Sequence, residues 1–127
     1  MTARYRKAFS PVNGDISATG SKVDVAVRTA GSMKNDAAVA AAFATLAADA
    51  SHLAGTLAAM NPPADLADDH RKLVSGLRVA AGGLARISRA AVDGDPKSAR
   101  AATDAAARAS SEVREPRRRI VAALDLE

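Results

Sequence analysis

The chain has no cysteine and no tryptophan, and only 2% of its 127 residues are aromatic. The absence of cysteine excludes disulfides, thiolate metal ligands and cysteine nucleophiles, and leaves the redox compartment open. The aromatic residues are Tyr5, Phe9 and Phe43. Three are too few for a typical base-stacking surface, or for a pocket that grips a flat ligand.

Signatures of common catalytic sites are missing too. The sequence contains no GxSxG, GxGxxG, P-loop or HExxH motif, and it has only two histidines. No nucleophile therefore stands beside an organised base. The carboxylates fall mostly near expected helix starts or on polar faces, where they cap helices and solubilise the surface. We predict a non-enzymatic protein that needs no cofactor.

Long apolar runs and a strong charge imbalance are also absent. The alanine-rich run over 37–48 is shorter than the roughly 20 apolar residues of a membrane span, so we expect a soluble chain. Fourteen acidic residues are mixed among eighteen basic ones, which gives a net charge of +4. This modest excess permits contact with nucleic acid or anionic lipid but decides for neither.

What the chain does have is alanine, which accounts for 33 of its residues within a hydrophobic content of 48%. Alanine has the best helix propensity, and its small side chain lets helices pack closely. A length of 127 residues suits one domain with a real core. We therefore predict an all-α fold, an antiparallel up-down-up-down four-helix bundle spanning 1–127. The helices are expected at about 3–30, 36–60, 64–92 and 96–124.

Each expected helix carries one apolar stripe with alternating steps of four and three residues, which is the heptad pattern of helices packed side by side. The stripes are Tyr5, Phe9, Val12, Ile16, Thr19, Val23 and Ala26; Val39, Phe43, Leu46, Ala50, Leu53, Leu57 and Met60; Leu66, His70, Leu73, Leu77, Ala80, Leu84, Ile87 and Ala91; and Ala99, Ala102, Ala106, Ala109, Val113, Pro116, Ile120 and Leu124. Leu53, Leu73 and Leu84 are accordingly expected in the core.

The connections at 31–35, 61–63 and 93–95 are short, which makes consecutive helices antiparallel neighbours. The rival architecture is an oligomer of long hairpins, because heptads do not say whether the facing helix belongs to the same chain. The chain is thus expected to be a monomer or a homodimer. Continuity of the first helix is open, since Ser10 and Pro11 are also typical of a fresh helix start.

The two histidines form one candidate ligand-binding or metal-binding site. His52 lies about nine residues before the turn at Pro62 and His70 about eight after it, so a hairpin brings them to the same level. With Asp49 and Asp69 nearby, imidazoles and carboxylates would converge on a divalent metal or another ligand. The alternative is that His70, on the apolar stripe, is a buried neutral imidazole hydrogen-bonded within the bundle. That alternative is favoured, and no resident metal is expected.

A second candidate is a basic end of the bundle, where the topology brings the two chain termini together. Its residues are Arg4, Arg6, Lys7, Arg114, Arg117, Arg118 and Arg119. Such an end suits anionic lipid headgroups, or phosphates. Nucleic acid is the less favoured partner because base-stacking aromatics are few. The favoured alternative is a solvated helix end whose arginines complement the helix dipole.

Two segments carry a resemblance to a known group. Asn61-Pro62-Pro63-Ala64-Asp65-Leu66 with His70 and Leu73, and the turn over 91–95, resemble uncharacterised helical-bundle domains of actinobacterial exported proteins and lipoproteins. The resemblance covers about residues 5–113. It implies an extracytoplasmic, cell-envelope location and supplies no catalytic residues. Leu126 and Glu127 match the scar left by a C-terminal histidine tag, so that location is expected if the segment was excised from a longer gene, and a cytoplasmic one otherwise.

Together these observations predict a non-catalytic helical bundle that acts as an extracytoplasmic sensing or protein-interaction module. Its partner would be a protein or a small ligand, bound between helices or along an exposed face, with an anionic membrane surface as a candidate at the basic end. The first alternative is a cytoplasmic basic bundle that binds nucleic acid or an acidic partner. The second is a metal-binding bundle that uses His52 and His70.

Overall fold

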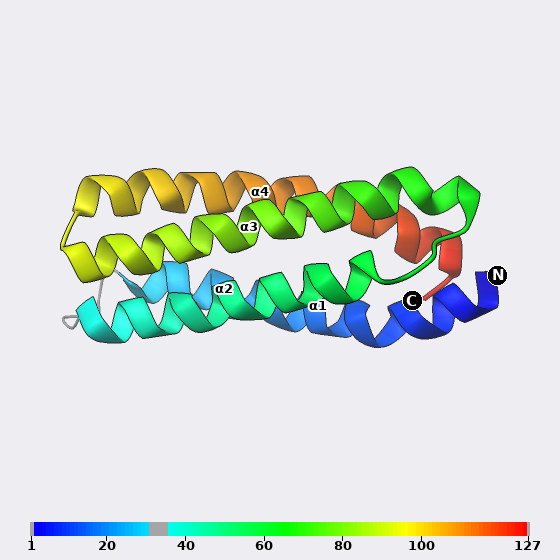
Figure 1. Ribbon diagram of the computed structural model, residues 1–127, viewed down its shortest axis with the longest axis horizontal. Helices are drawn as coiled ribbons and strands as arrows, with labels where there is room; N and C mark the ends of the chain where they lie inside the picture. The colour runs from blue at the N-terminus through cyan, green and yellow to red at the C-terminus, as the bar shows by residue number, and fades with distance from the viewer. Residues whose placement is uncertain (1, 31–35, 127) are drawn as a thin grey trace.

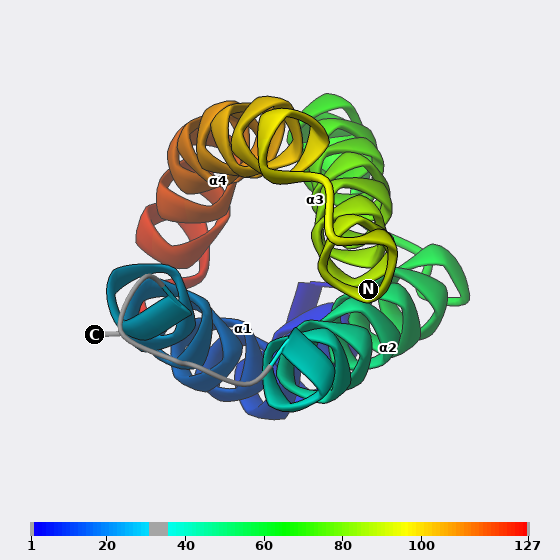
Figure 2. The ribbon, with the colours of Figure 1, turned by 90° about the vertical axis from the view of Figure 1, so that its left-hand side faces the viewer.

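The computed structural model describes residues 2–30 and 36–126, which contain four α-helices and no β-strand. The helices are α1 (Thr2–Ala30), α2 (Asp36–Ala58), α3 (Ala67–Asp93) and α4 (Pro96–Leu124), and a 3-10 turn, η1 (Ala64–Leu66), precedes α3. The four helices lie side by side around a shared core (Figure 1, Figure 2). The prediction of an all-α fold with four helices is confirmed. The connection at 31–35 lies outside the described residues.

Helix α1 continues through Pro11 rather than restarting there. Pro11 is exposed, while Phe9, Val12 and Ile16 on either side of it are buried on one stripe. Burial of that stripe on both sides of the proline offsets the lost backbone hydrogen bond. From Thr19 onward, however, the stripe is only half-buried. The second half of α1 is therefore less firmly packed than the first.

The two described turns follow from their residues. Helix α2 ends at Ala58, before Asn61-Pro62-Pro63, and the chain makes the tight turn η1 before α3 begins at Ala67. Gly94 ends α3 with a φ of 63°, a left-handed conformation that glycine adopts without strain. The Asp95 carboxylate then accepts from the Ser98 N–H at 3.2 Å and caps α4, which has proline at its first turn.

The predicted stripes form the core, and Leu53, Leu73 and Leu84 are 5%, 0% and 2% exposed, as expected. Most of the buried hydrophobic residues belong to one of two clusters. The terminal cluster, near the first turn of α1 and the last turn of α4, contains Tyr5, Phe9, Val12, Ile16, Leu53, Ala54, Leu57, Leu66, Leu73, Val74, Leu77, Val113, Ile120 and Leu124. The distal cluster contains Val39, Phe43, Leu46, Ala50, Leu84, Ile87, Ala102 and Ala106.

Helices α3 and α4 approach closely because α3 has glycine where the two backbones meet. A methyl group added at Gly76 would lie 2.7 Å from Val113 Cγ2, and one added at Gly83 would lie 3.3 Å from the Ala106 backbone. No such contact exists at Gly82, which is exposed. Gly76 and Gly83 therefore serve close packing, whereas Gly82 lies on the outer face of α3.

One described helix is long and apolar enough to cross a membrane by length and composition alone. It covers Ala37–Ala58 in α2 and has a mean hydropathy of 1.4. The alanine-rich run over 37–48 is shorter than a membrane span. The mean hydropathy over a longer stretch of the helix is nevertheless high, because apolar residues continue after that run. Of the 18-residue stretch with this hydropathy, 39% is buried inside the protein. Because the core helix of a soluble protein passes the same test, this is weak evidence for a span.

Candidate functional site

His70 links three helices through hydrogen bonds at one end of the core. Its Nε2–H donates to the Leu57 carbonyl of α2 at 2.8 Å, because a carbonyl oxygen can only accept. Its Nδ1 therefore accepts from the hydroxyl of Tyr5 in α1 at 2.7 Å. The Tyr5 ring also contacts the imidazole edge-on. This is the buried neutral histidine that the favoured interpretation of the sequence described.

Burial sets the protonation of both side chains. It lowers the pKa of His70 below its ordinary value of 6.5, against the opposing effect of the hydrogen bond to Leu57. Burial also raises the pKa of Tyr5 to about 12. Both groups are neutral at pH 7, and both ring nitrogens of His70 are already occupied. The imidazole thus has no nitrogen left for a metal ion or another ligand.

The other predicted ligands do not gather at His70. His52 is exposed on α2, and Asp49 borders a surface hollow beside Lys22 of α1. Asp69 pairs instead with Arg119 of α4, at 3.4 Å. Within the described parts of the chain, no group of three or more histidine, aspartate or glutamate residues is placed to hold a metal ion. Counting residues from the turn places the histidines along the hairpin, but it does not set the direction in which each helix turns its side chains.

Several arginines of the predicted basic end make contacts that stabilise the fold. Arg6 Nε donates to the Leu124 carbonyl at 2.8 Å, so it caps the last turn of α4. Arg117 Nε donates to Asn13 Oδ1 at 2.7 Å and ties α4 to α1. Arg118 and Arg119 both pair with Glu115.

Among the described residues, Arg4, Lys7 and Arg114 complete the predicted patch without an ion pair or hydrogen bond, and all three are exposed. Arg4 and Lys7 lie in the first turns of α1, whereas Arg114 is ten residues before the end of α4. The charge offered to a partner at this end is accordingly smaller than the sequence count implies.

A cavity of about 330 Å³ lies at mid-length, where the terminal and distal clusters meet. Its floor includes Leu53, Leu77, Leu84 and Val113, all of them buried. Each helix also contributes a small side chain to the lining, namely Thr19, Ala50, Ala80 and Ala106. Because these four side chains are short, they leave the space between the helices partly unfilled.

The rim of the cavity is polar and lies between α1 and α4, which pack against each other less extensively than the other neighbouring helices do. Helix α1 contributes Ser17, Ser21 and Asp24, and α4 contributes Ser110 and Arg114. An apolar floor with a few polar groups at the mouth is the usual composition of a small-molecule site. The poorly packed second half of α1 forms one wall of it.

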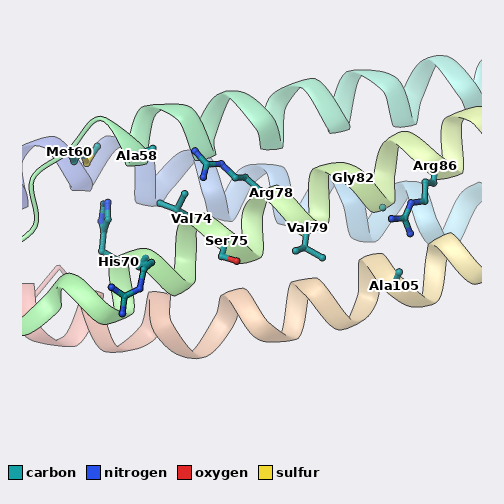
Figure 3. A pocket seen from close by; sticks show the side chains of 12 residues that line it. Ala58, Met60, His70, Val74, Ser75, Arg78, Val79, Gly82, Arg86 and Ala105 are labelled. Atoms are coloured by element: carbon teal, nitrogen blue, oxygen red, sulfur yellow. The ribbon is translucent and has the colours of Figure 1, made fainter.

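A second hollow, of about 590 Å³, follows the outer face of α3 (Figure 3). We call it the α3 groove and define it by Arg71, Ser75, Arg78, Val79, Gly82 and Arg86. Arg71 is paired with Asp68. Among the described residues, no ion pair or hydrogen bond reaches Arg78 or Arg86, and both are exposed. Between Asp69 and Asp93, α3 carries five basic residues and no acidic one.

The sequence reasoning missed both hollows. The α3 groove had a visible signal, since arginines recur at intervals of seven and eight residues over a stretch without carboxylates. The cavity had a fainter one, since Thr19, Ala50 and Ala80 each stand between larger residues of their stripes, and Ala106 lies in a stripe segment made of alanine. Only the alignment of all four helices shows that these short side chains share one place. Comparison with protein-family models, with curated proteins and with solved structures found no significant match.

Proposed function

We propose that the chain is a non-enzymatic, antiparallel up-down-up-down four-helix bundle that senses a small, mainly apolar ligand held between its helices. The observation that carries this proposal is the cavity at the junction of the terminal and distal clusters. The topology is supported by contacts between residues far apart in the chain. Arg6 reaches the carbonyl of Leu124, and Ser88 Oγ donates to the Ala40 carbonyl at 2.6 Å.

The lining favours a particular class of ligand. A volume of about 330 Å³ lies at the lower end of the range for small-molecule sites. The floor of leucine, valine and alanine suits an alkyl chain or a small ring, since burial of apolar surface drives its binding. Ser110 and Arg114 at the rim suit a hydroxyl or carboxylate head group that stays near water. A medium-chain carboxylate or alcohol combines these features.

The second half of α1 is the natural element to respond to such a ligand. Thr19 and Val23 are half-buried and border the cavity, whereas Phe9 in the first half is 0% exposed. A ligand that fills the cavity adds apolar contacts to this half and so favours its docked position. In a sensor, the docking of α1 would be the signal that a partner reads.

The residues with shifted pKa values support a binding role over a catalytic one. Tyr5, Asp68, His70 and Asp95 lie away from the cavity lining. Tyr5 and His70 are engaged with each other, while Asp68 and Asp95 pair with residues of their own helix ends. We place the module in the cell envelope, in keeping with the sequence resemblance to exported helical domains.

Equilibrium unfolding with octanoate and octan-1-ol as probes tests the proposal. A ligand at ten times its Kd raises the free energy of unfolding by about 1.4 kcal/mol. We expect this gain for the native chain and its loss in Thr19→Leu/Ala80→Leu, which fills the cavity from two sides. The matched control is Ala18→Leu/Ala85→Leu, at exposed positions of the same helices.

The response of the variants decides the outcome. The cavity-filled variant should be more stable than the native chain without any probe, because filling a void adds apolar contacts. If neither probe stabilises the native chain, or if both stabilise the filled variant equally, the cavity is not a binding site for this class of ligand.

A further inference from the structure

The outer face of α3 has features that packing within the chain does not explain. Val79 is 51% exposed and Gly82 has open space where a side chain would be. Arg78 and Arg86 flank them, as Figure 3 shows. Neither arginine has a carboxylate partner among the described residues, whereas Arg71, at one end of the groove, pairs with Asp68. The face is a concave, partly apolar surface bordered by positive charge.

We propose that the α3 groove docks an acidic amphipathic helix of a partner protein. This inference is independent of the ligand cavity, which shares no lining residue with the groove. The partner's carboxylates would pair with Arg78 and Arg86, and would compete with Asp68 for Arg71. Its apolar residues would rest on Val79 and the open surface at Gly82.

The spacing of the charges supports a helical partner. Arg71, Arg78 and Arg86 follow each other at seven and eight residues, or about 10 and 12 Å along the helix axis. A second helix laid along α3 presents glutamates at the same interval when they occupy every seventh position. Ser75 and Gly82, which lie between the arginines on the same face, have small side chains and permit close approach of the partner backbone.

The shape of the groove separates this partner from other polyanions. Val74 and Met60 line its floor and are largely buried, so apolar side chains must enter the hollow to reach them. A flat bilayer surface contacts only the protruding arginines. Nucleic acid offers phosphates but no apolar side chains. The groove has no Phe, Tyr or Trp on which a base can stack, and the one ring in its lining, the imidazole of His70, is buried. A peptide with acidic and apolar residues satisfies both parts of the surface.

The test uses synthetic peptides and fluorescence anisotropy with the full chain. One 21-residue peptide has a leucine stripe flanked by glutamate at every seventh position. A second has the same composition in scattered order, and a third has glutamine in place of glutamate. We expect the first peptide to bind most tightly, and its binding to weaken as salt is raised from about 50 to 500 mM, because exposed charge pairs are screened.

Variants locate the interaction on the groove. Arg78→Gln/Arg86→Gln should weaken binding of the first peptide by roughly threefold to thirtyfold, the sum of two exposed ion pairs. Arg100→Gln/Arg108→Gln removes the same charge from exposed positions of α4 and should change binding less than twofold. Gly82→Trp should block the groove while leaving every arginine in place.

Several results would overturn the inference. One is equal affinity for the ordered and the scattered peptide. Another is an equal loss of affinity in Arg78→Gln/Arg86→Gln and Arg100→Gln/Arg108→Gln, and a third is no binding of the ordered peptide at all. Tighter, Arg78- and Arg86-dependent binding to phosphatidylglycerol vesicles or to a single-stranded oligonucleotide would reassign the groove to lipid or nucleic acid. Circular dichroism of each variant confirms that the helices remain folded, since all the changed positions are exposed.

Discussion

Replacing Gly76 by alanine places a methyl group where α3 and α4 leave no room for one. The new Cβ would lie 2.7 Å from Val113 Cγ2 and 3.6 Å from Val113 Cα. Val113 is β-branched and only 8% exposed, so it has few alternative rotamers into which to move. Either the valine leaves its rotamer or the two helices separate locally.

The expected size follows from comparison with Gly82 in the same helix. Alanine in place of glycine favours a helix interior by roughly 1 kcal/mol, and this gain applies at both positions. At Gly82 nothing lies within 4 Å of the new methyl group, so the gain should appear in full. At Gly76 overpacking costs about 1–3 kcal/mol. The free energies of unfolding of Gly76→Ala and Gly82→Ala should therefore differ by about 1–3 kcal/mol.

Urea unfolding followed by circular dichroism at 222 nm measures this difference directly. We expect Gly82→Ala to be more stable than the native chain and Gly76→Ala to be equal to it or less stable. The gain in helix propensity is the same in both variants, so it cancels when their free energies of unfolding are compared. The remaining difference reports the contact with Val113 alone. Equal stabilisation by both substitutions would refute the reasoning, since it would mean that α3 and α4 are not in close contact at Gly76.

Three further predictions concern buried groups. Tyr5→Phe keeps the packed ring but deprives His70 Nδ1 of its donor, so it should cost about 1–3 kcal/mol of unfolding free energy in urea at pH 8. The pKa of His70 in the folded chain lies below its ordinary value of 6.5, so near that pH the unfolded chain binds more protons than the folded chain. The free energy of unfolding should therefore be highest above about pH 6.5 and should fall as the pH drops below it. His70→Gln should flatten that dependence, and an unchanged slope would contradict the assignment. Leu84→Ala should lower the free energy of unfolding by about 2–5 kcal/mol in the same assay, because Leu84 is buried. Val92→Ala is the control: Val92 is 72% exposed, so its loss should be less than about 0.5 kcal/mol.

The helices themselves could be predicted because heptad spacing and burial have the same cause. The predicted stripe residues from Val39 to Leu57 in α2 are buried, and so are those from Ala102 to Leu124 in α4. They are buried because each stripe must face the other helices. Local chemistry modified the boundaries. Helix α2 ends at Ala58 rather than at residue 60, and α3 begins only after the 3-10 turn η1, because Asn61-Pro62-Pro63 constrains the backbone on both sides.

The candidate sites were harder to predict because they depend on the relative rotation and alignment of whole helices. Residue counting placed His52 and His70 at one level but not on one face, and Asp69 pairs with Arg119 of a helix that the count did not consider. The cavity needs Thr19, Ala80 and their small neighbours to meet at a single level. This meeting depends on the alignment of four helices, so it cannot be predicted from the stripe of any single helix.

The central claim is that the mid-length cavity binds a small apolar ligand, and methyl NMR of the full chain titrated with octanoate tests it most directly. We expect saturable shifts at the cavity methyl groups of Leu53, Leu84 and Val113, with Leu66 and Leu124 in the terminal cluster unmoved. The shifts should vanish in Thr19→Leu/Ala80→Leu. Unmoved cavity methyl groups at millimolar octanoate, or the same shifts in the filled variant, would contradict the account.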